Sequence, residues 1–205
     1  MGNFTVTRLE VGPMAANCYI VADESKNDAF LIDPGGDPGR IKQILKKKDL
    51  NLKFIINTHG HGDHIFANGS FDVPIYIHKL EKEFLTDPDK NLSGMFGFLL
   101  KTPKAAKLLE DGEKIYLNDM EIEILHTPGH TPGGISIKLD KVVFTGDTLF
   151  AGGIGRTDFP DGSEETLLRS IKDKLLTLGD DVIVYPGHGP ESTIGEEKRT
   201  NSFLR

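Results

Sequence analysis

The segment that follows residue 58 packs three imidazoles and one carboxylate into six positions, in the order His59-Gly60-His61-Gly62-Asp63-His64. Neutral imidazole and carboxylate are ligands of zinc, iron and manganese, and the glycines let the backbone fold these side chains toward one point. Without a cation the cluster would destabilise the interior, because each buried polar group that lacks a partner costs about 1–3 kcal/mol. The segment therefore predicts a metal site.

Three later segments offer further ligands, each on a glycine-bearing loop directly after an apolar run typical of a buried strand. His130 follows the run at 122–125, Asp147 follows the run at 142–146, and His188 follows the run at 182–184. Loops at strand ends are where functional side chains gather. The candidate metal ligands are therefore His59, His61, Asp63, His64, His130, Asp147 and His188. This set suits two divalent ions that share one bridging carboxylate, because a single structural ion usually takes about four ligands.

The order His-x-His-x-Asp-His, then His, then Asp, then His resembles the metallo-β-lactamase superfamily. The runs Phe144-Thr145-Gly146-Asp147-Thr148-Leu149-Phe150 and Gly155-Arg156-Thr157-Asp158 look like the glyoxalase II (hydroxyacylglutathione hydrolase) branch and its small single-domain bacterial relatives. The resemblance covers nearly the whole chain, from the Asn17-Cys18-Tyr19 strand to His188 and Gly189. The combined motif is highly specific for the superfamily and less specific for the branch.

The division of the ligands between two ions comes from the resemblance. In an extended chain, residues 59, 61 and 63 would share one side and residue 64 would face away, so the spacing leaves the division open. The resemblance implies that His59, His61 and His130 hold one ion, that Asp63, His64 and His188 hold the other, and that Asp147 bridges both. Superfamily β-lactamases that carry a cysteine near the bridging position contrast with Asp147, which argues against antibiotic hydrolysis.

The local patterns alternate between strands and helices. Apolar, β-branched and aromatic runs predict strands at 5–11, 19–22, 29–33, 54–56, 75–78, 114–117, 120–125, 135–139, 141–145 and 182–184. Helices are expected from Asp37-Pro38, from Asp63, over 79–85, from Ser163 to Gly179 and after Thr193, where Glu196 completes a capping box. The segment 91–109 reads as irregular, and its apolar run at 95–100 fits a substrate mouth, a subunit contact or core packing.

Together these elements suggest two packed sheets with helices outside. The resemblance implies an α+β fold, called α/β in some schemes, that forms a four-layer αβ/βα sandwich of two mixed sheets. We expect one domain over residues 1–205, without the C-terminal helical domain that two-domain glyoxalase II members add.

Composition limits the function classes. The net charge of −7 does not support a broad positive groove for nucleic acid. The chain has no apolar run long enough to span a bilayer, and its first residues lack the pattern of a signal peptide, so we expect a cytoplasmic protein without a membrane partner. A single cysteine, Cys18, excludes an internal disulfide and is expected to be buried filler. The oligomeric state is not readable from the sequence.

The ligand set favours a dinuclear metallohydrolase with two divalent ions, zinc or alternatively iron or manganese. Metal-bound hydroxide, formed because the ions lower the pKa of water to about 7, would attack a substrate carbonyl. Asp63 would orient the hydroxide and accept its proton. A thiolate with a pKa near 8.5 leaves without a strong acid, so a small thioester of the S-lactoylglutathione type fits. Arg156 would either bind a substrate carboxylate or pair with Asp158 or a backbone carbonyl to fix its own loop.

Other functions stay open. The substrate could be another ester or thioester. Related members of the superfamily are persulfide dioxygenases, which use a single iron and would leave Asp63 and His64 unligated. A non-catalytic binding module predicts missing ligands, whereas all seven are present. His78 reads as a hydrogen-bonding or surface residue, and His126 as a neighbour that could support a ligand.

Overall fold

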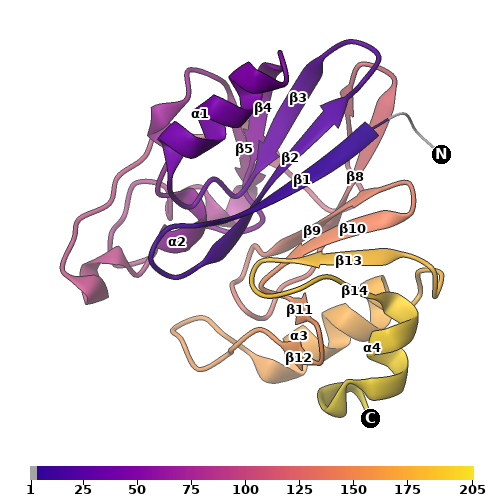
Figure 1. Ribbon diagram of the computed structural model, residues 1–205. Helices are drawn as coiled ribbons and strands as arrows, with labels where there is room; N and C mark the ends of the chain where they lie inside the picture. Colours follow the sequence, from indigo (N-terminus) through magenta and orange to yellow (C-terminus); the bar gives the residue numbers. More distant parts are fainter. Residues whose placement is uncertain (1–3) are drawn as a thin grey trace.

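The computed structural model describes residues 4–205 and contains two six-stranded mixed sheets packed face to face (Figure 1). The first sheet has the order β1-β2-β3-β4-β5-β6 and consists of β1 (Phe4–Val11), β2 (Ala16–Asp23), β3 (Asp28–Ile32), β4 (Asn51–Ile56), β5 (Ile75–His78) and β6 (Lys107–Leu109). Strands β1 to β3 pair antiparallel, and β3 to β6 pair parallel.

The second sheet is built from the later part of the chain. Its order is β14-β13-β10-β9-β8-β7, from β7 (Lys114–Leu117), β8 (Met120–His126), β9 (Ile135–Leu139), β10 (Val142–Gly146), β13 (Ile183–Pro186) and β14 (Ser192–Thr193). Only the β10–β13 pair is parallel. A small separate hairpin joins β11 (Leu149–Phe150) to β12 (Gly153–Ile154).

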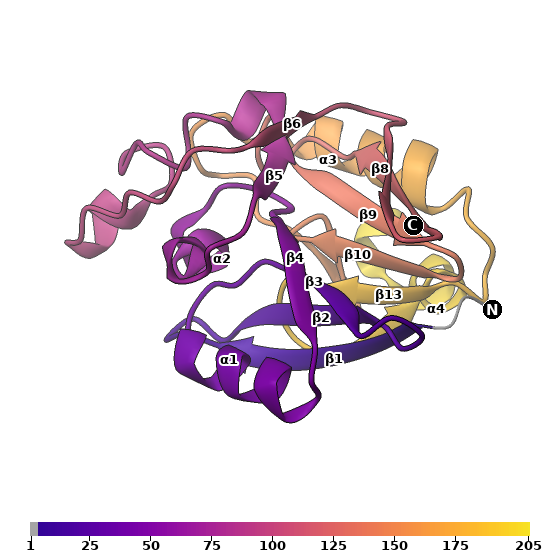
Figure 2. The same cartoon turned by 90° about the horizontal axis from the view of Figure 1, so that it is seen from above.

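Helices cover the outer face of each sheet, as Figures 1 and 2 show from two directions. Helices α1 (Pro38–Lys47) and α2 (Gly62–Ile65) lie against the first sheet. Helix α3 (Glu164–Ser170), the π-helical turn Ile171–Leu175 and α4 (Ile194–Thr200) lie against the second. The expected four-layer sandwich of two mixed sheets is therefore confirmed.

Strand β2 shows how the sequence produces these layers. Its side chains alternate between the two faces of the sheet, as in any strand. Cys18 and Ile20 pack in the outer cluster that contains Ile41 of α1, whereas Tyr19 and Val21 pack in the cluster between the sheets. Because both faces are covered, every residue of β2 is buried, and Cys18 is the buried filler that the sequence predicts.

Two expected helices differ in the structure. The segment 79–85 forms only the 3-10 turn Lys79–Glu81 followed by further turns, because the Glu81 side chain turns inward and is fully buried. The helix expected from Ser163 to Gly179 is α-helical only to Ser170 and continues as the π-helical turn. Ser163 caps it as predicted by accepting a hydrogen bond from the Thr166 amide.

The ends of the other helices also refine the predictions. Asp37 precedes α1, but its carboxylate caps nothing in the helix and instead accepts a hydrogen bond from the Gly12 amide at 2.9 Å. Thr193 caps α4 by accepting a hydrogen bond from the Glu196 amide at 3.1 Å.

Four short strands were not expected from the sequence. They are β6, at the end of the segment predicted to be irregular, and β11, β12 and β14. Among the described helices, none is long and apolar enough to cross a membrane.

Candidate metal centre

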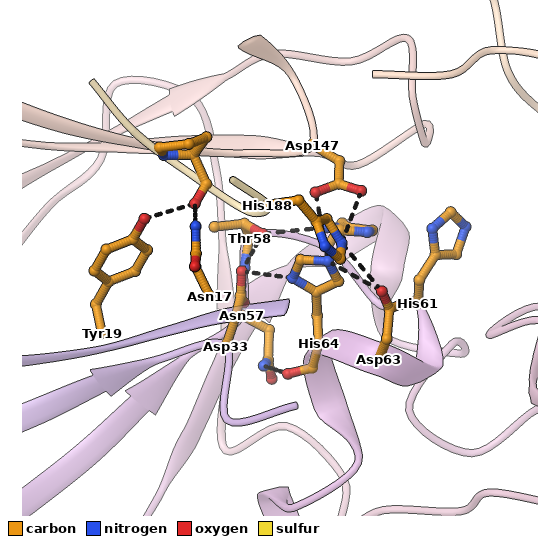
Figure 3. Close-up of polar contacts among 12 residues, drawn as sticks. Asn17, Tyr19, Asp33, Asn57, Thr58, His61, Asp63, His64, Asp147 and His188 are labelled. Atoms are coloured by element: carbon orange, nitrogen blue, oxygen red, sulfur yellow. Dashed lines mark hydrogen bonds and ion pairs between the residues drawn. The ribbon is translucent and has the colours of Figure 1, made fainter. Parts of the chain in front are cut away.

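The structure brings all seven predicted ligands together at one end of the sandwich, where strands of both sheets end (Figure 3 shows most of them). Strand β4 leads into His59, His61 and helix α2, which carries Asp63 and His64. From the second sheet, His130 lies on the β8–β9 loop, Asp147 directly follows β10, and His188 lies two residues after the end of β13.

The donor atoms form two trios with a carboxylate between them. Atoms of His59, His61 and His130 lie within 4.8 Å of one another, and so do atoms of Asp63, His64 and His188. Asp147 faces both trios: its Oδ1 lies 3.4 Å from His64 Nε2, and its Oδ2 lies 3.6 Å from His130 Nε2 and 3.8 Å from His188 Nε2. A third group, His59, His64 and Asp147, overlaps both trios. The two trios contain the residues of the division that the resemblance implies, and both that division and the ligation itself stay predictions.

The spacing of the donor atoms fits metal ligands. Two atoms held about 2.1 Å from one tetrahedral ion lie roughly 3.4 Å apart. His61 Nδ1 lies 3.0 Å from His130 Nε2, and His188 Nε2 lies 3.2 Å from Asp63 Oδ2. A cavity of about 10 Å³, lined in part by His59, His130 and Asp147, lies beside them. That volume is about the size that one water molecule or one small ion needs.

The protein also fixes which imidazole nitrogen faces the centre. Nδ1 of His59 lies 3.1 Å from the Thr58 hydroxyl, Nδ1 of His64 lies 3.0 Å from the Asp33 carboxylate, and Nδ1 of His130 lies 2.7 Å from a backbone carbonyl. In each ring Nδ1–H therefore donates, which leaves Nε2 as the nitrogen that could bind a metal ion. Nε2 of His59 and His64 and Oδ1 of Asp147 are buried without a hydrogen-bond partner among the described residues. A cation would satisfy these atoms, so the residues fit a metal centre.

The pKa values describe the centre without a cation. Burial, followed by the neighbouring imidazoles, lowers the pKa of His59 well below its usual value and lowers the pKa of His61 to about 3. Burial also acts to lower the pKa of His64, but Asp63, Asp147 and Asp33 outweigh it and raise that pKa to about 10. His59 and His61 are thus neutral and able to act as ligands, and a cation would replace the proton on His64.

Asp33 is a supporting residue that the sequence analysis missed. It lies just after β3, fully buried, in a left-handed backbone conformation with φ of 49°. One carboxylate oxygen lies within hydrogen-bond distance of His64 Nδ1 and accepts from the Thr58 hydroxyl at 2.6 Å, and the other accepts from the Thr58 amide at 2.8 Å. The available signal was a carboxylate at a strand end before Pro34-Gly35-Gly36, which alone is common in loops.

We expect Asp33→Asn to weaken metal binding at the trio that contains His64. The amide keeps the shape but places an N–H₂ group against Thr58 or His64, both of which donate. Loss of such a supporting carboxylate typically costs about 10–100-fold in metal affinity. Competition between the metal-free variant and a chelator for Zn²⁺ measures the effect, and an affinity equal to that of the wild type would contradict this role.

The loop that carries His188 is fastened to the first sheet. The Asn17 side chain donates to the Pro186 carbonyl at 2.9 Å, and the Tyr19 hydroxyl donates to the same carbonyl at 2.6 Å (Figure 3). The Asn17 side chain also donates to the Gly189 carbonyl at 2.9 Å. The Asn17 amide also donates to the Gly187 carbonyl at 2.7 Å. These bonds cross between the sheets and hold His188 opposite helix α2.

Arg156 lies on the rim of the centre. Its backbone carbonyl accepts from His130, and its guanidinium pairs with both oxygens of Asp158 at 2.7 Å while lying 3.9 Å from the Phe159 ring centre. Phe159 in turn packs edge-on against His61, with ring centres 5.6 Å apart. Arg156 thus pairs with Asp158 in the structure, as one of its two expected roles requires. Its other expected role, binding of a substrate carboxylate, stays a prediction.

The two histidines outside the trios stack on each other. The rings of His78 and His126 lie 4.2 Å apart and nearly parallel. His78 is buried and accepts a hydrogen bond from the Leu80 amide, as expected for a hydrogen-bonding residue. Nε2 of His126 lies 2.9 Å from the Pro132 carbonyl, so this ring supports the loop of His130 without reaching the centre.

The αβ/βα sandwich carries a His/Asp cluster that could hold metal ions, which places the chain among domains with a metal-binding site between two sheets. The chain belongs to the metallo-beta-lactamase superfamily, whose family model matches residues 11–188. Among curated relatives, the hydroxyacylglutathione hydrolase GloC of Haemophilus influenzae is 44% identical over 96% of this chain and 97% of its own length.

Two solved structures share the whole fold. One, described as the BLEG-1 B3 metallo-beta-lactamase, has a TM-score of 0.94 at 37% identity and covers 98% of this chain and 99% of that chain. Another, described as TTHA1623 in a di-iron-bound form, has a TM-score of 0.85 at 35% identity and covers 97% of this chain and 100% of that chain.

Proposed function

We propose that this protein is a dinuclear metallohydrolase that cleaves a small thioester of the S-lactoylglutathione type. The observation that carries the proposal is the pair of donor trios with Asp147 between them. The similarity to a relative described as a hydroxyacylglutathione hydrolase, over nearly the full length of both chains, supports the substrate class.

In this proposal His59, His61 and His130 hold one divalent ion, Asp63, His64 and His188 hold the other, and Asp147 contributes to both. When bound, such ions would lower the pKa of water and polarise a substrate carbonyl. The chemistry of the donors suits zinc, iron or manganese. The di-iron form of a relative that is 35% identical supports iron as a candidate beside zinc.

The protein's own groups would orient the reactants. The Asp63 carboxylate is partly exposed and pairs with His188, so it can orient the attacking water and take up its proton. A thiolate leaving group has a pKa near 8.5 and departs without a dedicated acid. The Phe159 ring beside His61 would exclude water from one side of the substrate.

We expect Arg156 to bind a carboxylate of the thiol part of the substrate. Arg156→Ala should raise KM by about tenfold or more with kcat little changed, because a charge-assisted hydrogen bond contributes about 1.5–3 kcal/mol. The backbone carbonyl that accepts from His130 stays in place in this variant. Steady-state kinetics with S-lactoylglutathione, and with a lactoyl thioester of an uncharged thiol as control, measure the effect. An equal change in KM for both substrates would contradict carboxylate binding.

Asp158→Ala gives the matched variant for the same loop. It frees the Arg156 guanidinium from its present partner, so KM for the charged substrate should fall or stay unchanged. A rise in KM comparable to that of Arg156→Ala would instead mean that the pair only fixes the loop.

The function is tested by elemental analysis of the purified protein together with hydrolysis assays in the presence and absence of air. The proposal expects two metal ions per chain and thioester hydrolysis that does not need oxygen. One iron per chain with oxygen consumption on a persulfide would favour a dioxygenase instead. A β-lactam is included because a structure with 37% identity is described as a metallo-beta-lactamase. Preferential β-lactam hydrolysis would overturn the thioester assignment and the argument from Asp147 against antibiotics.

A further inference from the structure

One buried carboxylate outside the candidate ligands links two of the loops that carry them. Glu81 lies at the end of the 3-10 turn that follows β5, and its side chain is fully buried. Its Oε2 accepts a hydrogen bond from the Gly60 amide at 2.9 Å, and its Oε1 accepts from the Gly133 amide at 2.8 Å. Burial raises the pKa of Glu81, and these two N–H groups stabilise its ionised form.

The two amides belong to the loops that supply the first trio. Gly60 lies between His59 and His61, and Gly133 lies on the loop of His130. That loop is closed by a hydrogen bond from the Thr127 amide to the Gly134 carbonyl at 2.8 Å, so fixing Gly133 fixes the loop as a unit. Glu81 thus joins a loop of the first sheet to a loop of the second.

Close packing accounts for glycine at both positions, chiefly against Glu81 at Gly133 and against Phe84 at Gly60. A Cβ atom on Gly133 would lie 2.7 Å from Cγ of Glu81 and 2.9 Å from Nδ1 of His78. A Cβ atom on Gly60 would lie 2.3 Å from Cβ of Phe84 and 3.1 Å from Oε2 of Glu81. Both backbones can reach the carboxylate only because no side chain intervenes.

The second trio has different supports. Asp33 contacts His64 directly and reaches His59 of the first trio only through the Thr58 hydroxyl, while Asn17 and Tyr19 hold the loop of His188. We propose that Glu81 is a positioning residue for one metal site alone: it sets the distance between the His59–His61 loop and the His130 loop, and so governs the affinity of that trio and not of the other. The proposal rests on the dinuclear centre of the proposed function.

The test is a Zn²⁺ titration of metal-free protein by calorimetry with a competing chelator. Glu81→Gln keeps the shape but sets an N–H₂ group against the amide of Gly60 or Gly133. His61→Ala and His188→Ala identify which binding event belongs to which trio. We expect Glu81→Gln to weaken the event lost in His61→Ala by about 10–100-fold, and to change the event lost in His188→Ala by less than about threefold.

Glu197→Gln is the matched control. Glu197 is equally buried and accepts from the Gly152 amide at 2.9 Å and from the Asn201 side chain at 2.8 Å, and it contacts neither loop of the first trio. Both binding events should stay unchanged in this variant. Equal weakening of both binding events in Glu81→Gln would overturn the proposal, because it would mean that Glu81 has only a general structural role. No weakening of either binding event would overturn it as well, because Glu81 would then have no role in metal binding.

A measurement on the unaltered protein covers the case in which Glu81→Gln does not fold. In metal-free wild type, the amide protons of Gly60 and Gly133 should exchange with solvent slowly, since both donate to a buried carboxylate. Exchange as fast as that of exposed loop amides would overturn the proposal. If the wild type binds fewer than two Zn²⁺ ions, the dinuclear function fails, while the exchange measurement still decides whether Glu81 holds the two loops.

Discussion

Asp147→Ala is expected to lose bound metal and hydrolytic activity together. Asp147 lies between the trios, with one oxygen 3.4 Å from His64 and the other 3.6 Å from His130, so its removal takes a shared donor from both sites. Divalent ions contribute several kcal/mol to stabilising charge in the transition state, so kcat/KM should fall by about 10³-fold or more. Metal content by elemental analysis and thioester hydrolysis measure the two effects on one preparation.

Asp147→Asn separates charge from shape in the same position. The amide preserves the packing against Gly187, which approaches the Asp147 side chain closely, but it removes the negative charge. We expect it to share the loss of metal while keeping the unfolding midpoint of the metal-free wild type. An Asp147→Ala variant that stays active with two bound ions would rule out the bridging role.

Phe144→Ala is expected to have the largest effect on stability, a loss of about 3–5 kcal/mol in the free energy of unfolding. Phe144 is fully buried between the two sheets. Its ring lies 5.0 Å from that of Tyr19 on the first sheet and 5.2 Å from that of Tyr185 on its own sheet. Truncation would open a cavity at the point where the sheets meet, close to the strand end that positions Asp147.

Urea unfolding of the metal-free protein measures this loss without a contribution from bound ions. Phe203→Ala serves as the control, because Phe203 is 51% exposed and its truncation should change stability by no more than about 0.5 kcal/mol. A change below about 1 kcal/mol for Phe144→Ala would show that the contact between the sheets is less important than its burial indicates.

The sequence predicted most strands because their patterns are local. The β-branched and aromatic content of β2 and the apolar runs of β4, β10 and β13 are each visible within a few residues. The helix over 79–85 was wrong because a contact distant in sequence draws Glu81 inward, and no local pattern encodes that contact. The short strands β6, β11 and β14 have two or three residues each, too few to show any period.

The candidate ligands could be predicted because seven unusual side chains occur in a specific order. The residues that hold these ligands in place could not be predicted in the same way. Asp33, Glu81 and Asn17 are single polar residues in or after strands, and each acts through partners 21 to 172 positions away. Nothing near them in sequence distinguishes them from ordinary loop residues, so only the assembled fold reveals what they hold.

The ligands are divided between the two halves of the chain. His59, His61, Asp63 and His64 belong to the half that forms the first sheet, whereas His130, Asp147 and His188 belong to the half that forms the second. During synthesis the earlier half emerges first and offers only part of each trio. Because tight binding would need the assembled ligands, we expect metal to bind only after the second sheet has docked on the first.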